Sequence, residues 1–388
     1  MRLQEILNAF PKKSGGKIDW SALESSVLGN VIWEMKSTMQ DSLYHGEGDV
    51  YTHTKMVCDA LVGFSELWLL SETERNVLLL SALLHDIGKT RCTRVVDGVI
   101  SSPHHAKTGA VMARELLWLQ IGLCGTKENQ NMRESVCALI QYHSYPPFAI
   151  SNKNPELKMI KVSSQGHLAP YFSIAKVCML EKADVLGRIS NDAQDYLERI
   201  ECCKLLAEEL GCSEAPYEFS DEFSQRAYIK KGGLPNAYAS FNDTWGEVIL
   251  MCGLPGTGKD TYIKKNYPNL PIVSLDQIRL DLKISPVGNQ SEVVAEGKRQ
   301  AREYLRKKQS FVWNATCITT LIRESLISLF EGYGASVKIV FLETEWQEQL
   351  RRNASRKAEV PRHAIEKMLS RLEIPEAYEA QSVVWEIV

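Results

Sequence analysis

The chain has 388 residues, of which 44% are hydrophobic and 24% charged, and its formal net charge is −3. This length exceeds that of one typical core and favours two domains. The composition is that of ordinary globular protein. The small net charge excludes a protein coated in basic residues for non-specific duplex binding, so any nucleic-acid contact must come from a local cluster.

The ten cysteines form no CxxC pair and lie mostly in apolar runs, which suits a reducing compartment. Residues Met1–Phe10 lack the uninterrupted apolar stretch of a signal peptide. No segment approaches the length of a membrane span. We therefore expect a cytoplasmic protein that does not contact a membrane.

Helical periodicity dominates residues 1–211, which we expect to form an all-α domain. The exception is Val95–Ile100, where Asp97-Gly98 predicts a small hairpin. The segments with apolar residues at helical spacing are Val57–Leu70, Glu74–Leu84, Thr108–Gly122, Glu134–Tyr142, Ile174–Leu186 and Asp192–Leu210.

The pattern changes after this domain. Residues 212–244 mix proline, glycine and aromatic residues without period, which is typical of a connector. Residues 245–388 alternate strands with helices, which predicts an α/β domain with a parallel sheet. The expected strands are Glu247–Cys252, Pro271–Leu275, Ser310–Trp313 and Ser336–Leu342, and the expected helices start near Lys259 and cover Val293–Lys308, Thr320–Gly332, Glu345–Arg356 and Arg362–Arg371.

The first domain carries histidines and carboxylates of metal-ligand type at helix ends. Four of them on packed helices can converge on one divalent ion, because neutral imidazoles and carboxylates are suitable ligands. Two more histidines at helix boundaries can hold a second ion, with Asp86 as the bridge. Two such ions would clamp a phosphate ester and supply a hydroxide nucleophile at neutral pH. The first set is His53, His85, Asp86 and Asp184, and the second is His105 and His143.

This order of residues resembles the HD phosphohydrolase superfamily over roughly residues 40–190. The resemblance implies that the six residues are metal ligands, with His105 rather than His104 as the fifth. It also implies a phosphate contact from Lys89, which Arg188 could assist. His45 is not assigned a role, and neither is His167.

The second domain contains Gly253-Leu254-Pro255-Gly256-Thr257-Gly258-Lys259 between a strand and a helix. This G-x-x-x-x-G-K loop cradles phosphates with its backbone N–H groups, while Lys259 reaches the terminal phosphates of an NTP. The expected NTP-binding residues are Gly253, Gly256, Thr257, Gly258, Lys259, Asp260 and Thr261. Asp260 stands where a Ser or Thr hydroxyl normally meets Mg²⁺, so either it serves the ion, directly or through water, or the hydroxyl role is relaxed.

Four further residues predict a phosphoryl-transfer site. Asp276 and Arg279 follow the second strand as D-x-x-R, at the edge where open α/β sheets bind ligands. A carboxylate there can take a proton from an attacking hydroxyl, while the arginine binds a neighbouring phosphate. Arg352 and Arg356, four residues apart, are expected on one helix face as a lid over the donor phosphates. Asn314 ends a strand where an acidic metal-associated residue would be expected.

Residues 247–371 resemble bacterial and bacteriophage polynucleotide 5′-kinases in the phosphate loop, D-x-x-R and the two lid arginines. The resemblance implies that Asp276 is the general base, that Arg279 binds the phosphate beside the acceptor 5′-hydroxyl, and that Arg352 and Arg356 contact the donor. Asp260 and Asn314 depart from the phage pattern.

The two halves together resemble bacterial bifunctional end-healing enzymes. The resemblance implies that the first domain removes a 2′,3′-cyclic, 2′ or 3′ phosphate, using a transition metal such as Mn²⁺, Co²⁺ or Ni²⁺. The second would phosphorylate 5′-hydroxyl ends of RNA or DNA with NTP and Mg²⁺. Sealing would fall to a separate ligase, and a homo-oligomer is compatible with the sequence. Two alternatives are a nucleotidase joined to a small-molecule kinase and a nucleotide-sensing regulator.

Overall fold

The computed structural model describes residues 2–230, 232, 242–356 and 358–388. The chain forms two compact units, Met1–Leu123 with Glu128–Glu218, and Cys124–Lys127 with Phe219–Val388. The expected connector at 212–244 falls partly on residues outside those described. No helix in the described ranges is both long and apolar enough to cross a bilayer.

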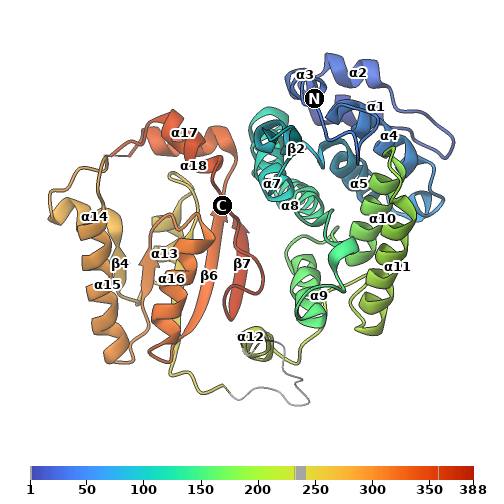
Figure 1. Ribbon diagram of the computed structural model, residues 1–388. Coiled ribbons are helices and arrows are strands. Elements are labelled where there is room, and N and C mark those ends of the chain that lie inside the picture. The colour runs from blue at the N-terminus through green and yellow to red at the C-terminus, as the bar shows by residue number, and fades with distance from the viewer. Residues whose placement is uncertain (1, 231, 233–241, 357) are drawn as a thin grey trace. The chain divides into compact units, whose positions relative to one another are not determined.

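The first unit is helical, as the sequence predicts (Figure 1). The expected hairpin is also present, with β1 (Arg94–Val96) antiparallel to β2 (Val99–Ser101). The α-helices that begin in residues 2–209 are α1 (Arg2–Ala9), α2 (Trp20–Ser25), α3 (Gly29–Lys36), α4 (Val50–Val62), α5 (Glu72–Leu84), α6 (Lys89–Cys92), α7 (His105–Glu115), α8 (Lys127–Tyr142), α9 (Pro155–Ser163), α10 (Ile174–Leu186) and α11 (Ala193–Glu209). Shorter turns of helix cover Glu66–Leu69, Leu116–Ile121, Pro146–Phe148 and Ser164–His167.

Helix α5 forms the centre of the first unit. A capping box between Ser71 and Glu74 starts it, because each side chain accepts a hydrogen bond from the other's backbone N–H. Every residue from Asn76 to Leu84 is buried, and α4 and α10 pack against the helix. The residues that follow α5 therefore enter the interior of the unit.

One predicted helix in this unit was placed wrongly. The sequence indicated Val57–Leu70, whereas α4 runs from Val50 to Val62. The side chain of Asp49 caps α4 by accepting a hydrogen bond from the Thr52 N–H. At the other end, the Gly63 N–H bonds back to the last turn, and the chain continues in a short 3₁₀ turn at Glu66–Leu69.

The second unit is built on a sheet that has five parallel strands within the described residues, in the order β4-β5-β3-β6-β7. Strand β3 is central, so the loop that follows it leaves the sheet near the point where the strand order reverses. The strands are β3 (Glu247–Cys252), β4 (Ile272–Ser274), β5 (Val312–Asn314), β6 (Ser336–Glu343) and β7 (Ser382–Ile387). The helices are α12 (Glu222–Lys230), α13 (Lys259–Asn266), α14 (Leu275–Asp281), α15 (Ser291–Arg306), α16 (Thr320–Glu331), α17 (Trp346–Ala354) and α18 (Arg362–Leu369).

The parallel sheet confirms the expected α/β class, although several elements differ from the expectation; helices α12 and α14, for example, were not predicted. Strand β7 was not expected; it pairs in parallel with β6 along its whole length (Figure 1). Helix α17 ends at Ala354 rather than Arg356. The Asn353 side chain donates to the Val360 carbonyl and accepts from the Val360 N–H, so the chain turns back directly after the helix.

Candidate functional sites

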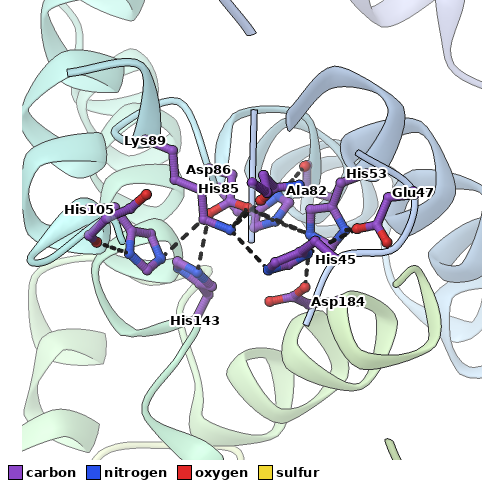
Figure 2. A network of polar contacts seen from close by, with 12 residues as sticks. His45, Glu47, His53, Ala82, His85, Asp86, Lys89, His105, His143 and Asp184 are labelled. Atoms are coloured by element: carbon purple, nitrogen blue, oxygen red, sulfur yellow. Dashed lines mark hydrogen bonds and ion pairs between the residues drawn. The ribbon is translucent and has the colours of Figure 1, made fainter. Parts of the chain in front are cut away.

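Asp86 lies at the centre of a cluster of histidines inside the first unit (Figure 2). Its Oδ2 lies 3.3 Å from His85 Nε2 and 3.5 Å from His53 Nε2, and its Oδ1 lies 3.5 Å from His105 Nε2 and 4.0 Å from His143 Nε2. Asp86 thus faces one pair of histidines through each oxygen. The two groups His53-His85-Asp86 and Asp86-His105-His143 are each compact enough to hold a metal ion.

Asp184 completes the first group from α10. Its Oδ1 lies 3.0 Å from His53 Nε2. All six residues expected to bind metal therefore lie around one buried centre, although they come from five separate segments of the chain (Figure 2).

Three of the histidines are oriented by a carbonyl of their own chain segment. Nδ1 lies 2.8 Å from the Ala82 carbonyl in His85, 2.9 Å from the Ser102 carbonyl in His105, and 2.7 Å from the Ile140 carbonyl in His143. Nδ1 must donate to these acceptors, so the Nε2 lone pair points to the centre of the cluster. A carbonyl that accepts from the ring nitrogen facing away from the ion is typical of metal-binding histidine.

The residues fit divalent ions on three further observations. Asp86 Oδ1 is buried and makes no hydrogen bond to any described residue, which a cation would explain. The Nε2 atoms of His53 and His85 face each other at 3.4 Å. Burial raises the pKa of Asp86, but the charge of Lys89 and the contacts with neighbouring histidines lower it more, so the pKa lies well below its usual range and the group is a carboxylate.

Gly88 allows the two halves of the cluster to meet. A Cβ atom at this position would clash with the backbone carbonyl oxygen of His105 and with the backbone of Gly109. The turn after Asp86 therefore packs directly on the start of α7, which brings His105 within reach of Asp86.

Glu47 borders the candidate site, and the sequence interpretation did not include it. Its Oε1 lies 2.9 Å from Nδ1 of both His53 and His45, and its Oε2 accepts a hydrogen bond from the Ile189 N–H. His53 therefore depends on a carboxylate where the other three depend on backbone carbonyls. His45, Glu47 and His53 could also hold a cation, but the Nδ1 contact and the Asp86-facing Nε2 favour Glu47 as the residue that orients His53.

Lys89 contacts the loop that carries Glu47. Its Nζ lies 2.7 Å from Asp86 Oδ2, donates to Gln40 Oε1 at 2.6 Å and lies 3.4 Å from His45 Nε2. His45, which the sequence left without a role, thus borders the cluster. Arg188 stacks on the Tyr196 ring at 4.4 Å, and its buried Nε and Nη2 make no hydrogen bond to a described residue.

The phosphate loop of the second unit follows β3 and starts α13. Lys259 Nζ donates to the carbonyls of Gly253 and Leu254 at 2.8 and 2.9 Å, which holds the side chain back across the loop. Gly256 has φ +84°, and a Cβ there would lie 2.6 Å from the Gln349 carbonyl oxygen, so only glycine lets α17 approach. Burial lowers the pKa of Lys259 to about 8.

Asp260 and Asn314, the two residues that depart from the phage pattern, are in direct contact. Asn314, at the end of β5, donates through Nδ2 to Asp260 Oδ1 at 2.6 Å. The loop therefore still carries one carboxylate beside the phosphate position. That carboxylate comes from the helix, where a hydroxyl would be expected, and the strand end supplies an amide.

Asp276 is held by two arginines at the carboxyl end of β4. Arg279 Nη1 donates to its Oδ1 at 2.6 Å and Arg356 Nη2 to its Oδ2 at 2.9 Å. Burial raises its pKa, but these two arginines lower it more, so the pKa lies below the usual range. The side chain is 65% exposed, so a substrate can reach the carboxylate.

The two expected lid arginines do not share a helix face. Arg352 lies on α17, donates to Glu348 at 2.7 Å and passes close to Gly258 of the phosphate loop. Arg356 follows the end of the helix and turns to Asp276 instead. Arg352 thus borders the phosphate loop, and Arg356 binds the expected general base.

Each half of the chain matches a known protein family. Residues 50–165 match the HD domain and residues 248–375 match an AAA domain. The HD match includes five of the six expected metal ligands, and Asp184 lies beyond its end. The chain therefore contains an HD domain followed by a P-loop kinase-like domain, a combination that supports a bifunctional enzyme of nucleotide or nucleic-acid processing.

The contact between Glu47 and His53 generates a prediction. Glu47→Ala should weaken divalent-metal binding by the first unit about 10- to 100-fold, because His53 loses the acceptor that fixes its ring. Isothermal titration with Mn²⁺ measures this directly. The exposed Glu66→Ala variant is the matched control. Unchanged metal affinity in a folded Glu47→Ala protein would contradict the orienting role.

Proposed function

We propose that the protein heals broken nucleic-acid ends. In this proposal the HD domain hydrolyses a 2′,3′-cyclic, 2′ or 3′ phosphate, and the P-loop domain transfers a phosphoryl group from NTP to a 5′-hydroxyl end. It rests on one observation above all, a carboxylate held by two arginines beside a phosphate loop, in the same chain as a buried cluster of metal-ligand type. RNA or DNA ends would be the substrates, and a separate ligase would seal the products.

The kinase half follows from the contacts of Asp276. Its carboxylate accepts the proton of the acceptor 5′-hydroxyl as that oxygen attacks the terminal phosphorus of NTP, and NDP leaves. Lys259 exchanges its two loop carbonyls for donor phosphate oxygens, and Arg352 lies close enough to Gly258 to join it. Arg279 then binds the phosphate that follows the acceptor nucleoside. Mg²⁺, when bound, would neutralise charge on the transferred phosphate.

The hydrolase half follows from the ligand cluster. His53, His85, Asp86 and Asp184 would hold one ion, and Asp86, His105 and His143 a second. Imidazole-rich ligands favour transition metals such as Mn²⁺, Co²⁺ or Ni²⁺ over Mg²⁺. Bound ions would polarise the phosphate ester and lower the pKa of water. Lys89 would turn from Gln40 to a phosphate oxygen, and the ester oxygen would leave as the 3′- or 2′-hydroxyl.

One oligonucleotide tests both activities. Purified protein is incubated with an oligonucleotide that carries a 5′-hydroxyl and a 3′ phosphate, with ATP, Mg²⁺ and Mn²⁺, and both ends are analysed. Asp86→Ala should abolish 3′ dephosphorylation, because it removes the shared ligand, and should leave 5′ phosphorylation near the wild-type rate. Asp195→Ala, at an exposed position of the same unit, is the control. Loss of both activities in folded Asp86→Ala protein would contradict two separate sites.

The roles of Asp276 and Arg279 are separable by acceptor. Asp276→Ala should reduce 5′ phosphorylation by about 10²- to 10⁴-fold, as expected for a lost general base, and preserve ATP binding. Arg279→Ala should raise the KM for an oligonucleotide acceptor and affect a lone nucleoside much less, because only the oligonucleotide offers an adjacent phosphate. Equal losses on both acceptors would favour a small-molecule kinase.

The pairing of Asp260 with Asn314 predicts compensation between two substitutions. Asn314→Asp should weaken Mg²⁺-dependent ATP binding by about tenfold (~1.4 kcal/mol), because it sets a second carboxylate against the first. Asp260→Ser removes the only carboxylate of the pair and should also weaken binding. The double variant returns the carboxylate to the strand and the hydroxyl to the helix, and should recover most of the affinity. Titration calorimetry at fixed Mg²⁺ measures all four proteins; purely additive losses would exclude a shared role.

A further inference from the structure

A pocket opens in the P-loop unit beside the expected general base. Its volume is about 310 Å³. Most of its lining is apolar and comes from the end of β5 and from α14, α15 and α16. Leu275 on one wall directly precedes Asp276, and Ala315 on another directly follows Asn314. The pocket wall therefore includes the residue next to Asp276, the expected acceptor of the 5′-hydroxyl proton.

The residues that line this pocket differ in exposure: those at its floor are buried, and those at its rim are exposed. Trp313 is 1% exposed and contributes to the wall. At the rim, Leu321 is 76% exposed and Ile322 is 47% exposed. Large apolar side chains exposed around a hollow indicate a surface that another group covers. Lys298 is the one cation among the lining residues, and its Nζ donates to Ser325 Oγ at 3.0 Å.

We propose that the pocket binds the nucleobase of the 5′-terminal nucleoside of the acceptor. This inference rests on the proposed kinase function. The volume is at the lower end of the range for ligand pockets, about 300–1,000 Å³, and so suits a single nucleoside group rather than a larger ligand. Apolar walls accept the faces of any base, and Lys298 at the rim complements the negative charge of the backbone.

Occupation of the pocket has a mechanistic consequence. A base seated between the apolar walls fixes the nucleoside at one end, while Arg279 holds the following phosphate. The 5′-hydroxyl is then confined near Asp276, which converts binding energy into orientation. Since the lining offers few hydrogen-bonding groups, the pocket requires a base but selects no particular one.

The test has two parts. A substitution in the protein fills the pocket, and an abasic acceptor lacks the base that would occupy it. Ser325→Trp places an indole at an exposed rim position, and Ser328→Trp, one turn along α16 and outside the lining, is the matched control. Each protein is assayed with two 5′-hydroxyl oligonucleotides that differ only in whether the terminal residue carries a base. KM for each acceptor and for ATP is measured.

The wild-type protein should bind the abasic acceptor about tenfold or more weakly, in line with the stacking energy of one base. Ser325→Trp should raise the KM of the normal acceptor by a similar factor, leave the KM of the abasic acceptor and of ATP unchanged, and leave kcat near wild type. Ser328→Trp should match wild type.

Three outcomes would overturn the inference while the kinase function stands: equal KM values for the two acceptors in wild type, a rise in the ATP KM in Ser325→Trp, or an equal loss of both acceptors in that variant. Failure of the wild-type protein to phosphorylate either oligonucleotide would instead refute the kinase function, and the inference with it.

Discussion

The carboxylate of Asp86 is buried among four imidazoles and one ammonium group, and the first unit is arranged around it. A charge in this position is costly unless it is paired. Helix α5 delivers the carboxylate, Gly88 lets α7 approach, and α4 and α10 supply His53 and Asp184. Each of these elements reaches Asp86 through its end or its first turns. In this unit, the packing of the helices and the pairing of the Asp86 charge therefore depend on each other.

In the second unit, the charged groups of the site lie at the exposed carboxyl edge of the sheet and are paired there. Its charged groups stand where the strands end, and they pair with one another across the position of the substrate phosphates. Lys259 is bound to loop carbonyls, Asp276 to Arg279 and Arg356, and Asp260 to Asn314. In the proposed reaction, phosphate binding would exchange these internal contacts for contacts to the ligand, and the internal contacts already orient the groups.

Local patterns allowed much of this architecture to be predicted. The apolar period of α5 and α10, and the strand-loop-helix context of the phosphate loop, indicated both the fold class and the candidate ligands. Strand β7 was not predicted because its residues are mostly half-buried and because it is stabilised by non-local pairing with β6. The position at which α4 starts was not predicted, because the first turn is stabilised by the Asp49 cap and by burial and shows no apolar periodicity.

Glu47 illustrates a different limit. It lies in a loop, and no helical spacing relates it to His53; only the tertiary path of the chain, anchored at Ile189, brings the two together. The position of Arg356 was likewise decided by a side chain, since Asn353 turns the chain after α17. Such contacts depend on loop geometry, which periodicity does not encode.

The buried ligand cluster also links the protein's stability to its surroundings. Metal ions that bind the folded first unit stabilise it in proportion to the logarithm of their free concentration above the dissociation constant. The P-loop unit has its own sheet and core, and no such cluster among its described residues. When metal ions are scarce, the first unit would therefore lose this stabilisation, whereas the P-loop unit would not be affected in this way.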